Sequence, residues 1–215
     1  MALAFQLDAV AESRPRYNIA PTQLAPVVRS TADGRRELAE LRWGLIPSWA
    51  TDRSIGSRMI NARAETAATK PAFRSAMRHR RCLIPADGFY EWQKLGKQKQ
   101  PIFIHRCDDL PFAFAGLWEH WTDEEQRPLE TFTILTTAAN DQLRPLHDRM
   151  PIVLRPESYS RWLDPSATDA AAVEPLLVDL PPEFALQPVS PHVNSIANDD
   201  PSCIAPLQGQ RNLFE

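Results

Sequence analysis

The chain has 215 residues, of which 43% are hydrophobic and 24% charged, and its formal net charge is −3. This composition predicts one folded domain over residues 1–215 and excludes a chain that is disordered throughout. Residues 1–8 lack the basic segment of an export signal, and no apolar run approaches the length of a membrane span, so a cytoplasmic protein that does not contact a membrane is expected.

The first half of the chain alternates between extended pieces, turns and one helix. Residues 1–12 are predicted as a strand or a short helix that closes at 13–15, and residues 16–22 as an extended piece. A β-hairpin is expected from 26–28 and 38–43, followed by a loop over 44–49. A single helix is predicted over 65–80, with Pro71 in its first turns and with Phe73 and Met77 on its inner face.

The second half reads as a succession of strands with helices near the end. Strands are predicted at about 82–85, 89–94, 101–106, 112–119, 131–139 and 151–154, and helical segments at 156–163 and 169–178. The order of strands and turns predicts antiparallel pairing. The expected fold class is α+β: a closed, barrel-like or sandwich-like antiparallel sheet with peripheral helices.

Charge is unevenly distributed along the sequence. Residues 53–106 contain 12 Lys/Arg and 3 Asp/Glu, a balance of +9, whereas the other residues contain 12 basic and 24 acidic side chains. A basic segment in an acidic protein favours an anionic partner, and the sizeable candidates are the phosphates of nucleic acid. The alternative is a solvated helix face: Arg74, Arg78, His79, Arg80 and Arg81 are expected on the exposed side and at the C-terminal end of the predicted helix, where cations suit its dipole.

The sequence lacks the usual motifs of nucleotide, dinucleotide and metal chemistry. It contains no G-x-x-x-x-G-K-[ST], G-x-G-x-x-G, G-x-S-x-G or H-E-x-x-H segment, and Cys82, Cys107 and Cys203 have no C-x-x-C spacing. No cofactor, metal or disulfide framework is therefore expected, and each cysteine is predicted to be a small buried hydrophobic residue. Acid–base catalysis by side chains is the chemistry that remains as a candidate.

Three polar residues are candidates for that chemistry. Glu91 lies between aromatic residues in a predicted strand, where desolvation would raise its carboxyl pKa, unless its side chain faces water. His147 has a carboxylate neighbour and suits a general acid or base, although a lone histidine is also common as a structural residue. Asn61 would orient a substrate or cap a turn. Trp43 and Trp49, beside the basic segment, are predicted either to stack on an unpaired base or to anchor the core.

The order of several motifs resembles the SRAP domain family, the SOS response-associated peptidases that process abasic sites. The resemblance covers nearly the whole chain and rests on RYNIAP at 16–21, WG at 43–44, INARAET at 60–66, ADGFYEW at 86–92, LTTAA at 135–139 and HDRMP at 147–151. It implies a monomeric DNA-repair protein of the cytoplasm and nucleoid that holds single-stranded DNA and crosslinks to abasic sites. It also implies catalytic roles for Asn61, Glu91 and His147 and a phosphate contact by Arg63. The further predicted DNA contacts are Trp43, Trp49, Pro21, Arg58 and Arg74.

The same resemblance implies a covalent mechanism that needs an N-terminal cysteine. Members begin Met-Cys-Gly-Arg and remove their own initiator Met, after which the α-amine and thiol of that cysteine capture the sugar aldehyde. This sequence begins Met1-Ala2-Leu3-Ala4-Phe5 instead. Two explanations remain open at this stage: a true start four codons upstream, or loss of the nucleophile that leaves a non-covalent binding module for single-stranded DNA. A peptidase acting on other proteins is a remoter reading.

Overall fold

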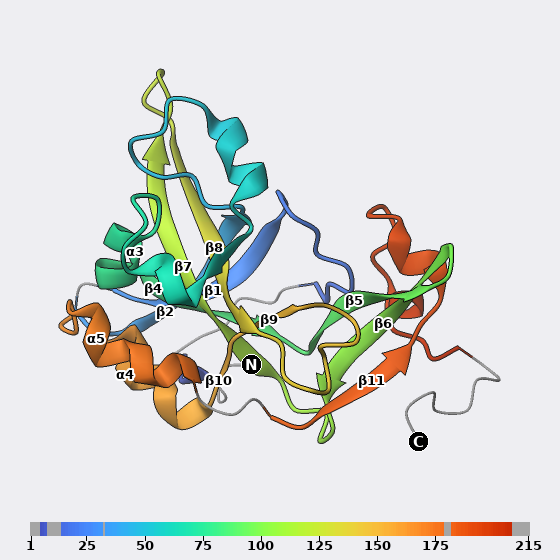
Figure 1. Cartoon of the computed structure of the whole chain (residues 1–215). Coiled ribbons are helices and arrows are strands. Elements are labelled where there is room, and N and C mark those ends of the chain that lie inside the picture. Colours follow the sequence, from blue (N-terminus) through green and yellow to red (C-terminus); the bar gives the residue numbers. More distant parts are fainter. Residues whose placement is uncertain (1–4, 8–13, 32, 179–181, 208–215) are drawn as a thin grey trace.

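The computed structural model describes residues 5–7, 14–31, 33–178 and 182–207, and within these ranges it is an α+β fold built on two sheets (Figure 1). The larger, eight-stranded sheet contains β1 (Leu24–Ser30), β2 (Arg36–Trp43), β3 (Asn61–Arg63), β4 (Arg81–Ala86), β7 (Phe112–Thr122), β8 (Pro128–Ala138), β9 (Arg149–Pro151) and β10 (Val153–Leu154). The second sheet contains β5 (Gly88–Leu95), β6 (Gln98–Arg106) and β11 (Phe184–Pro188).

The larger sheet closes on itself. Its strands follow the order β10-β7-β4-β1-β2-β8-β3, and an additional pairing of β7 with β8 joins β7, β4, β1, β2 and β8 into a ring. The predicted α+β class with a barrel-like sheet is therefore confirmed, as is the hairpin of β1 and β2, which pair antiparallel from Leu24↔Arg42 to Ser30↔Arg36.

The expectation of purely antiparallel pairing is wrong. β8 pairs parallel with β2 at Arg42↔Thr131 and parallel with β3 at Asn61↔Ile134. Parallel neighbours cannot be joined by a tight hairpin and need a long connection. Here the connections contain whole strands, so no local turn signal in the sequence marks these pairings.

Alternate residues of the large sheet pack into two separate cores. One core contains Val28, Leu83 and Leu117 and is covered by α3 (Arg74–His79), α4 (Tyr159–Leu163) and α5 (Ala170–Val173); this side is called the helix face. The other core contains Val27, Cys82, Ile84, Phe114 and Ile134, together with Ile102, Ile104 and Phe184 of the second sheet; this side is called the sheet face. Figure 1 shows the helices and the second sheet on opposite sides of the ring.

The single helix predicted over 65–80 is two short helices. α2 (Ala64–Ala67) and α3 are separated by turns at 68–73, and Pro71 lies in this break rather than inside a helix. The break follows because proline has no amide N–H to continue the helical hydrogen bonds. Phe73 and Met77 are buried as predicted, one turn apart, and the Met77 amide donates to the Phe73 carbonyl at 2.8 Å.

Two of the arginines expected on an exposed face have structural partners instead. The Arg81 side chain is only 5% exposed, and its guanidinium donates to the backbone carbonyls of Trp162, Met77, Arg78 and Asp164. Arg80 forms an ion pair with Glu119 at 2.7 Å. Arg74, Arg78 and His79 are exposed as predicted.

The remaining sequence predictions have mixed outcomes. The helical segments at 156–163 and 169–178 are confirmed as η2 (Pro156–Ser158) with α4, and as α5 with η3 (Glu174–Val178). Cys82 and Cys203 are buried, but Cys107 is exposed, so its prediction is wrong. The prediction for 1–12 lies mostly outside the described residues. Among those residues, none of the helices has the length and apolarity to cross a membrane.

Candidate active site

Glu91 lies on β5, with its side chain half-buried on the same side as Phe89. Phe89 packs edge-on against Phe114 and Phe184, which fixes this part of β5 to the sheet face. Burial raises the pKa of the Glu91 carboxyl above its ordinary value, while the charge of His147 and the backbone amide of Trp92 act in the opposite direction. The pKa is thus raised by desolvation, in the direction that the sequence indicated.

His147 follows a compact turn that is held by Asn140. The Asn140 side chain accepts from the Leu143 amide at 2.9 Å, and the Leu143 carbonyl accepts from the His147 amide at 3.1 Å. The imidazole is half-exposed; its Nδ1 lies 3.0 Å from both the amide nitrogen and the carbonyl oxygen of Arg149, and 3.4 Å from Asp148 Oδ1. Because His147 acts electrostatically on Glu91, the fold brings together two candidates that are far apart in the sequence.

An ion pair connects the His147 segment to the Asn61 segment. Arg149 donates to both carboxylate oxygens of Glu65, each at 2.8 Å, and Arg149 Nη2 also donates to the Thr136 carbonyl at 2.7 Å. Glu65 is the second residue of α2, which directly follows β3, and Arg149 begins β9. The sequence analysis did not single out either residue. The only signal for their pairing was their opposite charge within the motifs at 60–66 and 147–151.

Asn61 and Arg63 lie on β3, next to β8. Ala62 between them is buried in the core of the helix face, so the side chains of Asn61 and Arg63 point to the opposite side. Both are exposed, and within the described part of the chain neither side chain has a hydrogen bond or ion pair. Thr136 of β8 pairs with Arg63 of β3 on one edge and with Pro151 of β9 on the other. The segment that contains Asn61 and Arg63 and the segment that follows His147 therefore meet at the same part of β8.

The two tryptophans have different roles. Trp43 is half-buried, stacks on Phe132 with ring centroids 6.3 Å apart, and donates from Nε1 to the Ile60 carbonyl at 2.8 Å, directly before Asn61. Trp43 therefore anchors the start of β3. Trp49 is 60% exposed, which contradicts a core role. Pro21 is also exposed, and the next residue, Thr22, donates its amide to the Trp43 carbonyl at 2.8 Å.

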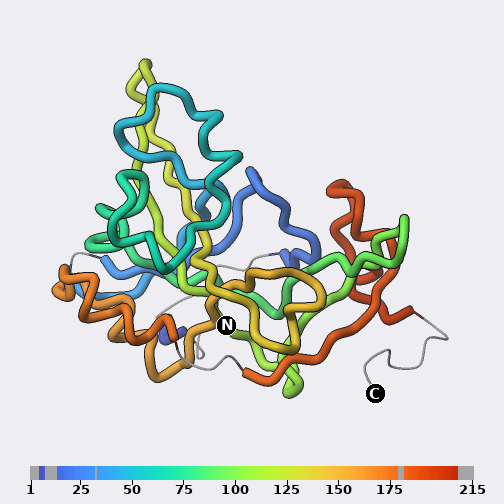
Figure 2. The backbone as a smooth tube through the Cα atoms, viewed as in Figure 1, coloured from blue at the N-terminus to red at the C-terminus, as the bar shows by residue number. Residues whose placement is uncertain are grey.

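The loop that carries Trp49 and Arg58 is closed at its base by two glycines. Gly44 has a φ of +123°, and a Cβ there would lie 2.5 Å from the Gly56 carbonyl oxygen; a Cβ on Gly56 would lie 2.6 Å from the Gly44 oxygen. Within the loop, η1 (Arg53–Arg58) is capped by Asp52, which accepts from the Ser54 amide at 2.8 Å. Figure 2 shows the loop beside the tip of the β7–β8 hairpin, where Trp121 donates to the Ala50 carbonyl at 2.6 Å.

Arg74 is the candidate that the fold separates from the others. It begins α3, which packs on β4 and β7 at the helix face, whereas Glu91 lies on the second sheet across the ring (Figure 1).

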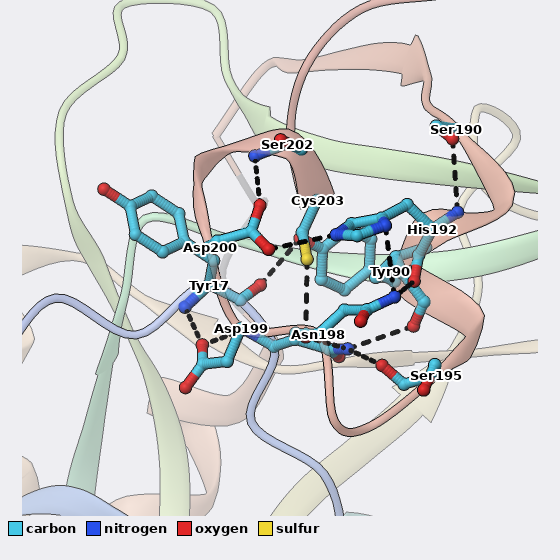
Figure 3. A network of polar contacts seen from close by, with 12 residues as sticks. Tyr17, Tyr90, Ser190, His192, Ser195, Asn198, Asp199, Asp200, Ser202 and Cys203 are labelled. Carbon is cyan, nitrogen blue, oxygen red and sulfur yellow. Dashed lines mark hydrogen bonds and ion pairs between the residues drawn. The ribbon is translucent and has the colours of Figure 1, made fainter.

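The outer side of β5 is held by the C-terminal segment. Tyr90 donates from its hydroxyl to the Tyr17 carbonyl at 2.7 Å, and Trp92 Nε1 donates to Asn194 at 2.8 Å. The buried Asn18 amide donates to three carbonyls of 193–198, and Asp199 accepts from the amides of Tyr17 and Asn18 (Figure 3). These contacts support the strand that presents Glu91.

Comparisons with known proteins identify the family of the chain and solved structures with a similar fold. The sequence profile of the family described as "SOS response associated peptidase (SRAP)" matches residues 2–196. The abasic site processing protein YoqW of Bacillus subtilis is 46% identical over 196 residues, which cover 90% of this chain and 87% of the relative. The abasic site processing protein HMCES of Gallus gallus is 33% identical over 227 residues, which cover 91% of this chain and 67% of the relative. A crystal structure of a protein from Bacteroides thetaiotaomicron superposes with a TM-score of 0.76 at 29% identity, covering 86% of this chain and 82% of that one.

Proposed function

Because the chain belongs to the SOS response associated peptidase (SRAP) family, we propose that it processes abasic sites in single-stranded DNA at the site formed by Asn61, Glu91 and His147. Relatives with 46% and 33% identity are named abasic site processing proteins. The observation that carries the proposal is the half-buried Glu91 carboxyl, whose pKa is raised by burial beside the imidazole of His147. Such a carboxyl keeps its proton to a higher pH than an exposed one and suits proton transfer.

The target chemistry matches these side chains. A ring-opened abasic sugar carries an aldehyde, to which an amine adds to form a carbinolamine; loss of the hydroxyl group as water then gives an imine. Glu91 supplies the proton to that departing hydroxyl, and His147 assists the opening of the sugar ring. Asn61, with a free amide in the described structure, orients the amine.

The exposed residues around the site suit a strand whose target lacks a base. Arg63 and Arg58 provide cations for phosphates, and Trp49 offers an aromatic face on which a neighbouring base stacks. Pro21 and the anchored Trp43 complete the expected DNA surface. Phosphate and stacking contacts carry little sequence information, which fits a lesion that occurs in any sequence.

The finer proposal is a covalent crosslink through an N-terminal cysteine. Its amine forms the imine and its thiol then adds to the imine carbon, closing a thiazolidine, so that the overall reaction releases one water. Glu91 would also serve in removal of the preceding initiator Met. The printed sequence has Ala2 after Met1, and an alanine offers an amine without a thiol, so this step is tested on two chains.

The experiment compares the printed chain with the same chain preceded by Met-Cys-Gly-Arg. Each is incubated with single-stranded DNA containing one abasic site, and products are separated by denaturing electrophoresis with intact-mass measurement. The extended chain is expected to lose its initiator Met and form an adduct that survives denaturation, whereas the printed chain binds reversibly. If neither chain forms an adduct but both bind, the protein is a non-covalent binding module.

Glu91→Gln in the extended chain tests the site assignment. General acid–base catalysis contributes a factor of about 10² to 10⁴, so both adduct formation and Met removal are expected to slow by at least about 100-fold, with DNA affinity unchanged. Glu157→Gln, at an exposed carboxylate of η2 beside α4, is the matched control and keeps the original rates. Unchanged rates in Glu91→Gln would show that Glu91 is not the proton donor.

A further inference from the structure

A second group of reactive side chains lies in the C-terminal segment, on residues for which the proposed function has no use. His192 lies in η4 (Pro191–Asn194), Asp200 caps η5 (Pro201–Cys203), and Cys203 ends η5. One potential ligand atom from each of these side chains lies within 4.8 Å of the other two. Figure 3 shows the three side chains converging around Asn198.

We propose that His192, Asp200 and Cys203 bind a divalent cation of the zinc class, with water as the fourth ligand. Thiolate sulfur, imidazole nitrogen and carboxylate oxygen are the donor types that zinc accepts, and three protein ligands leave one position for solvent. A thiolate in the set disfavours magnesium and calcium, which prefer oxygen ligands. The spacing of His192, Asp200 and Cys203 in the sequence matches no common metal motif. The three side chains meet because the turn between η4 and η5 brings His192 next to Asp200.

The local hydrogen bonds leave one ligand atom of Asp200 and one of His192 aimed at each other. Asp200 uses Oδ1 to accept from the Ser202 amide at 2.8 Å, which caps η5, and its Oδ2 lies 3.0 Å from His192 Nε2. A cation inserted between Oδ2 and Nε2 therefore keeps the cap intact.

The burial of the three side chains shows from which side a cation would enter the site. Cys203 is fully buried, whereas the side chains of His192 and Asp200 are 35% and 46% exposed. The thiol thus forms the floor, and the imidazole and carboxylate form the solvent side. Cys203 Sγ donates to the Asn198 carbonyl at 3.4 Å; a thiol is a weak donor, so a cation displaces one weak hydrogen bond when the thiol gives up its proton to solvent.

Asn198 has to adjust when the cation binds. Its Nδ2 lies 3.1 Å from His192 Nδ1 and 2.7 Å from the His192 carbonyl, which places the ring proton on Nε2, toward Asp200. A cation on Nε2 moves that proton to Nδ1. The Asn198 amide then turns so that Oδ1 accepts it, at the loss of the Nδ2 hydrogen bond to the His192 carbonyl; such an outer contact is the one that metal-bound histidines usually have.

Such a cation would fasten together η4 and η5. These turns provide the contacts that hold Asn18 and the Tyr17 amide, and Trp92 is bonded to Asn194 in η4. A ligand that binds the folded state alone raises its stability by mass action. Zinc is therefore expected to raise the melting temperature of the full chain, and chelation by EDTA to lower it again.

Cobalt(II) titration of the reduced full chain tests the proposal directly. Co²⁺ replaces Zn²⁺ in such sites, and a cysteine ligand produces an intense sulfur-to-cobalt charge-transfer absorption. We expect this absorption to saturate at one equivalent, to disappear in Cys203→Ser, and to persist in Cys107→Ser, which changes the exposed cysteine. Absence of the band in the parent chain, or its loss in Cys107→Ser, would overturn the proposal and leave Cys203 as a buried hydrophobic residue.

A second variant avoids any folding defect caused by a hydroxyl at the buried position 203. Asp200→Asn retains Oδ1 for the cap of η5 and is expected to weaken Zn²⁺ binding by at least about tenfold in competition with a chromogenic chelator. Because the amide also loses the Oδ2 contact with His192 Nε2, the comparison is made within each variant: the zinc-induced increase in melting temperature over EDTA is expected in the parent and absent in Asp200→Asn. Equal Zn²⁺ affinity in Asp200→Asn and in the parent would contradict the assigned ligand set.

Discussion

Arginine side chains serve opposite purposes on the helix face and at the candidate site. At the helix face, Arg81 is buried and its guanidinium satisfies four backbone carbonyls, and Arg80 is paired with Glu119. Near β3, Arg63 and Arg58 are exposed and have no ion pair within the described residues. A count of charges along the sequence cannot separate the two uses, because both groups fall in the same basic segment, 53–106.

The largest effect is expected at the helix face. Arg81→Met removes the donors of four carbonyls, and a buried polar group left without a partner costs about 1–3 kcal/mol, so the free energy of unfolding should fall by about 3 kcal/mol. Urea denaturation of the variant and the parent chain measures this change in the free energy of unfolding. Arg78→Met, at an exposed position of α3, should change stability by less than about 0.5 kcal/mol. Similar unfolding free energies for Arg81→Met and Arg78→Met would contradict a structural role for Arg81 that the exposed Arg78 lacks.

The next effect is expected at the exposed tryptophan. Base–aromatic stacking contributes about 1–3 kcal/mol per base, so Trp49→Ala should weaken single-stranded DNA binding about tenfold or more, as measured by fluorescence anisotropy. Stability should change little because the ring is 60% exposed. Trp49→Phe retains an aromatic face and should recover most of the affinity; equal weakening in both variants would argue against stacking.

A smaller effect separates Arg63 from the arginines of α3. Each phosphate neutralised on a single strand contributes about 0.7 to the slope of log affinity against log salt concentration. Arg63→Ala should therefore reduce that slope by about 0.7, whereas Arg74→Ala and Arg78→Ala should leave it unchanged if α3 lies away from the DNA. A reduced slope in Arg74→Ala would extend the binding surface to the helix face and restore the sequence-based assignment of Arg74.

The smallest effect is a pKa change inside the site. Burial raises the pKa of Glu91 and the charge of His147 lowers it, so His147→Gln should raise the Glu91 pKa further, as followed by carbon NMR of the carboxyl. Because the folded-state pKa exceeds the unfolded one, the stability contributed by protonated Glu91 is full below the unfolded pKa and lost as pH rises through the folded pKa. Because glutamine does not titrate, the free energy of unfolding of Glu91→Gln should fall less than that of the parent as the pH rises through this range. A lower Glu91 pKa in His147→Gln would contradict the assigned coupling.

Sequence patterns predicted the parts of the fold that depend on near neighbours. The strand predicted at about 82–85 is confirmed within β4, and the two-residue period of the strand sends Leu83 to one core and Cys82 and Ile84 to the other. The turn between β1 and β2 likewise predicts their hairpin. The parallel pairing of β3 with β8 was missed because it joins Asn61 to Ile134, and no local pattern records which distant strand a short segment will meet.

The candidate site divides in the same way. The sequence indicated the direction of the Glu91 pKa shift but not its cause: Tyr90 and Trp92, its neighbours in the sequence, point to the other face of β5, and the carboxyl is desolvated by the tertiary packing on the Phe89 side. The Glu65–Arg149 ion pair could not be predicted, since its members are 84 residues apart and meet only after β3 and β9 have joined opposite sides of β8. Exposure of Trp49 also depends on tertiary packing, which leaves this tryptophan outside while Trp43, six residues earlier, stacks on Phe132.

The contact between Gly44 and Gly56 has a consequence for recognition. Two backbones that meet where no side chain fits close the loop at its neck, and the cap by Asp52 orders its interior. Ordering a flexible loop on binding consumes part of the interaction energy, about 0.5–1.5 kcal/mol for each immobilised long side chain. The backbone of this loop is already ordered in the folded protein, so a DNA strand that contacts Trp49 and Arg58 has to immobilise their side chains but not the loop that carries them.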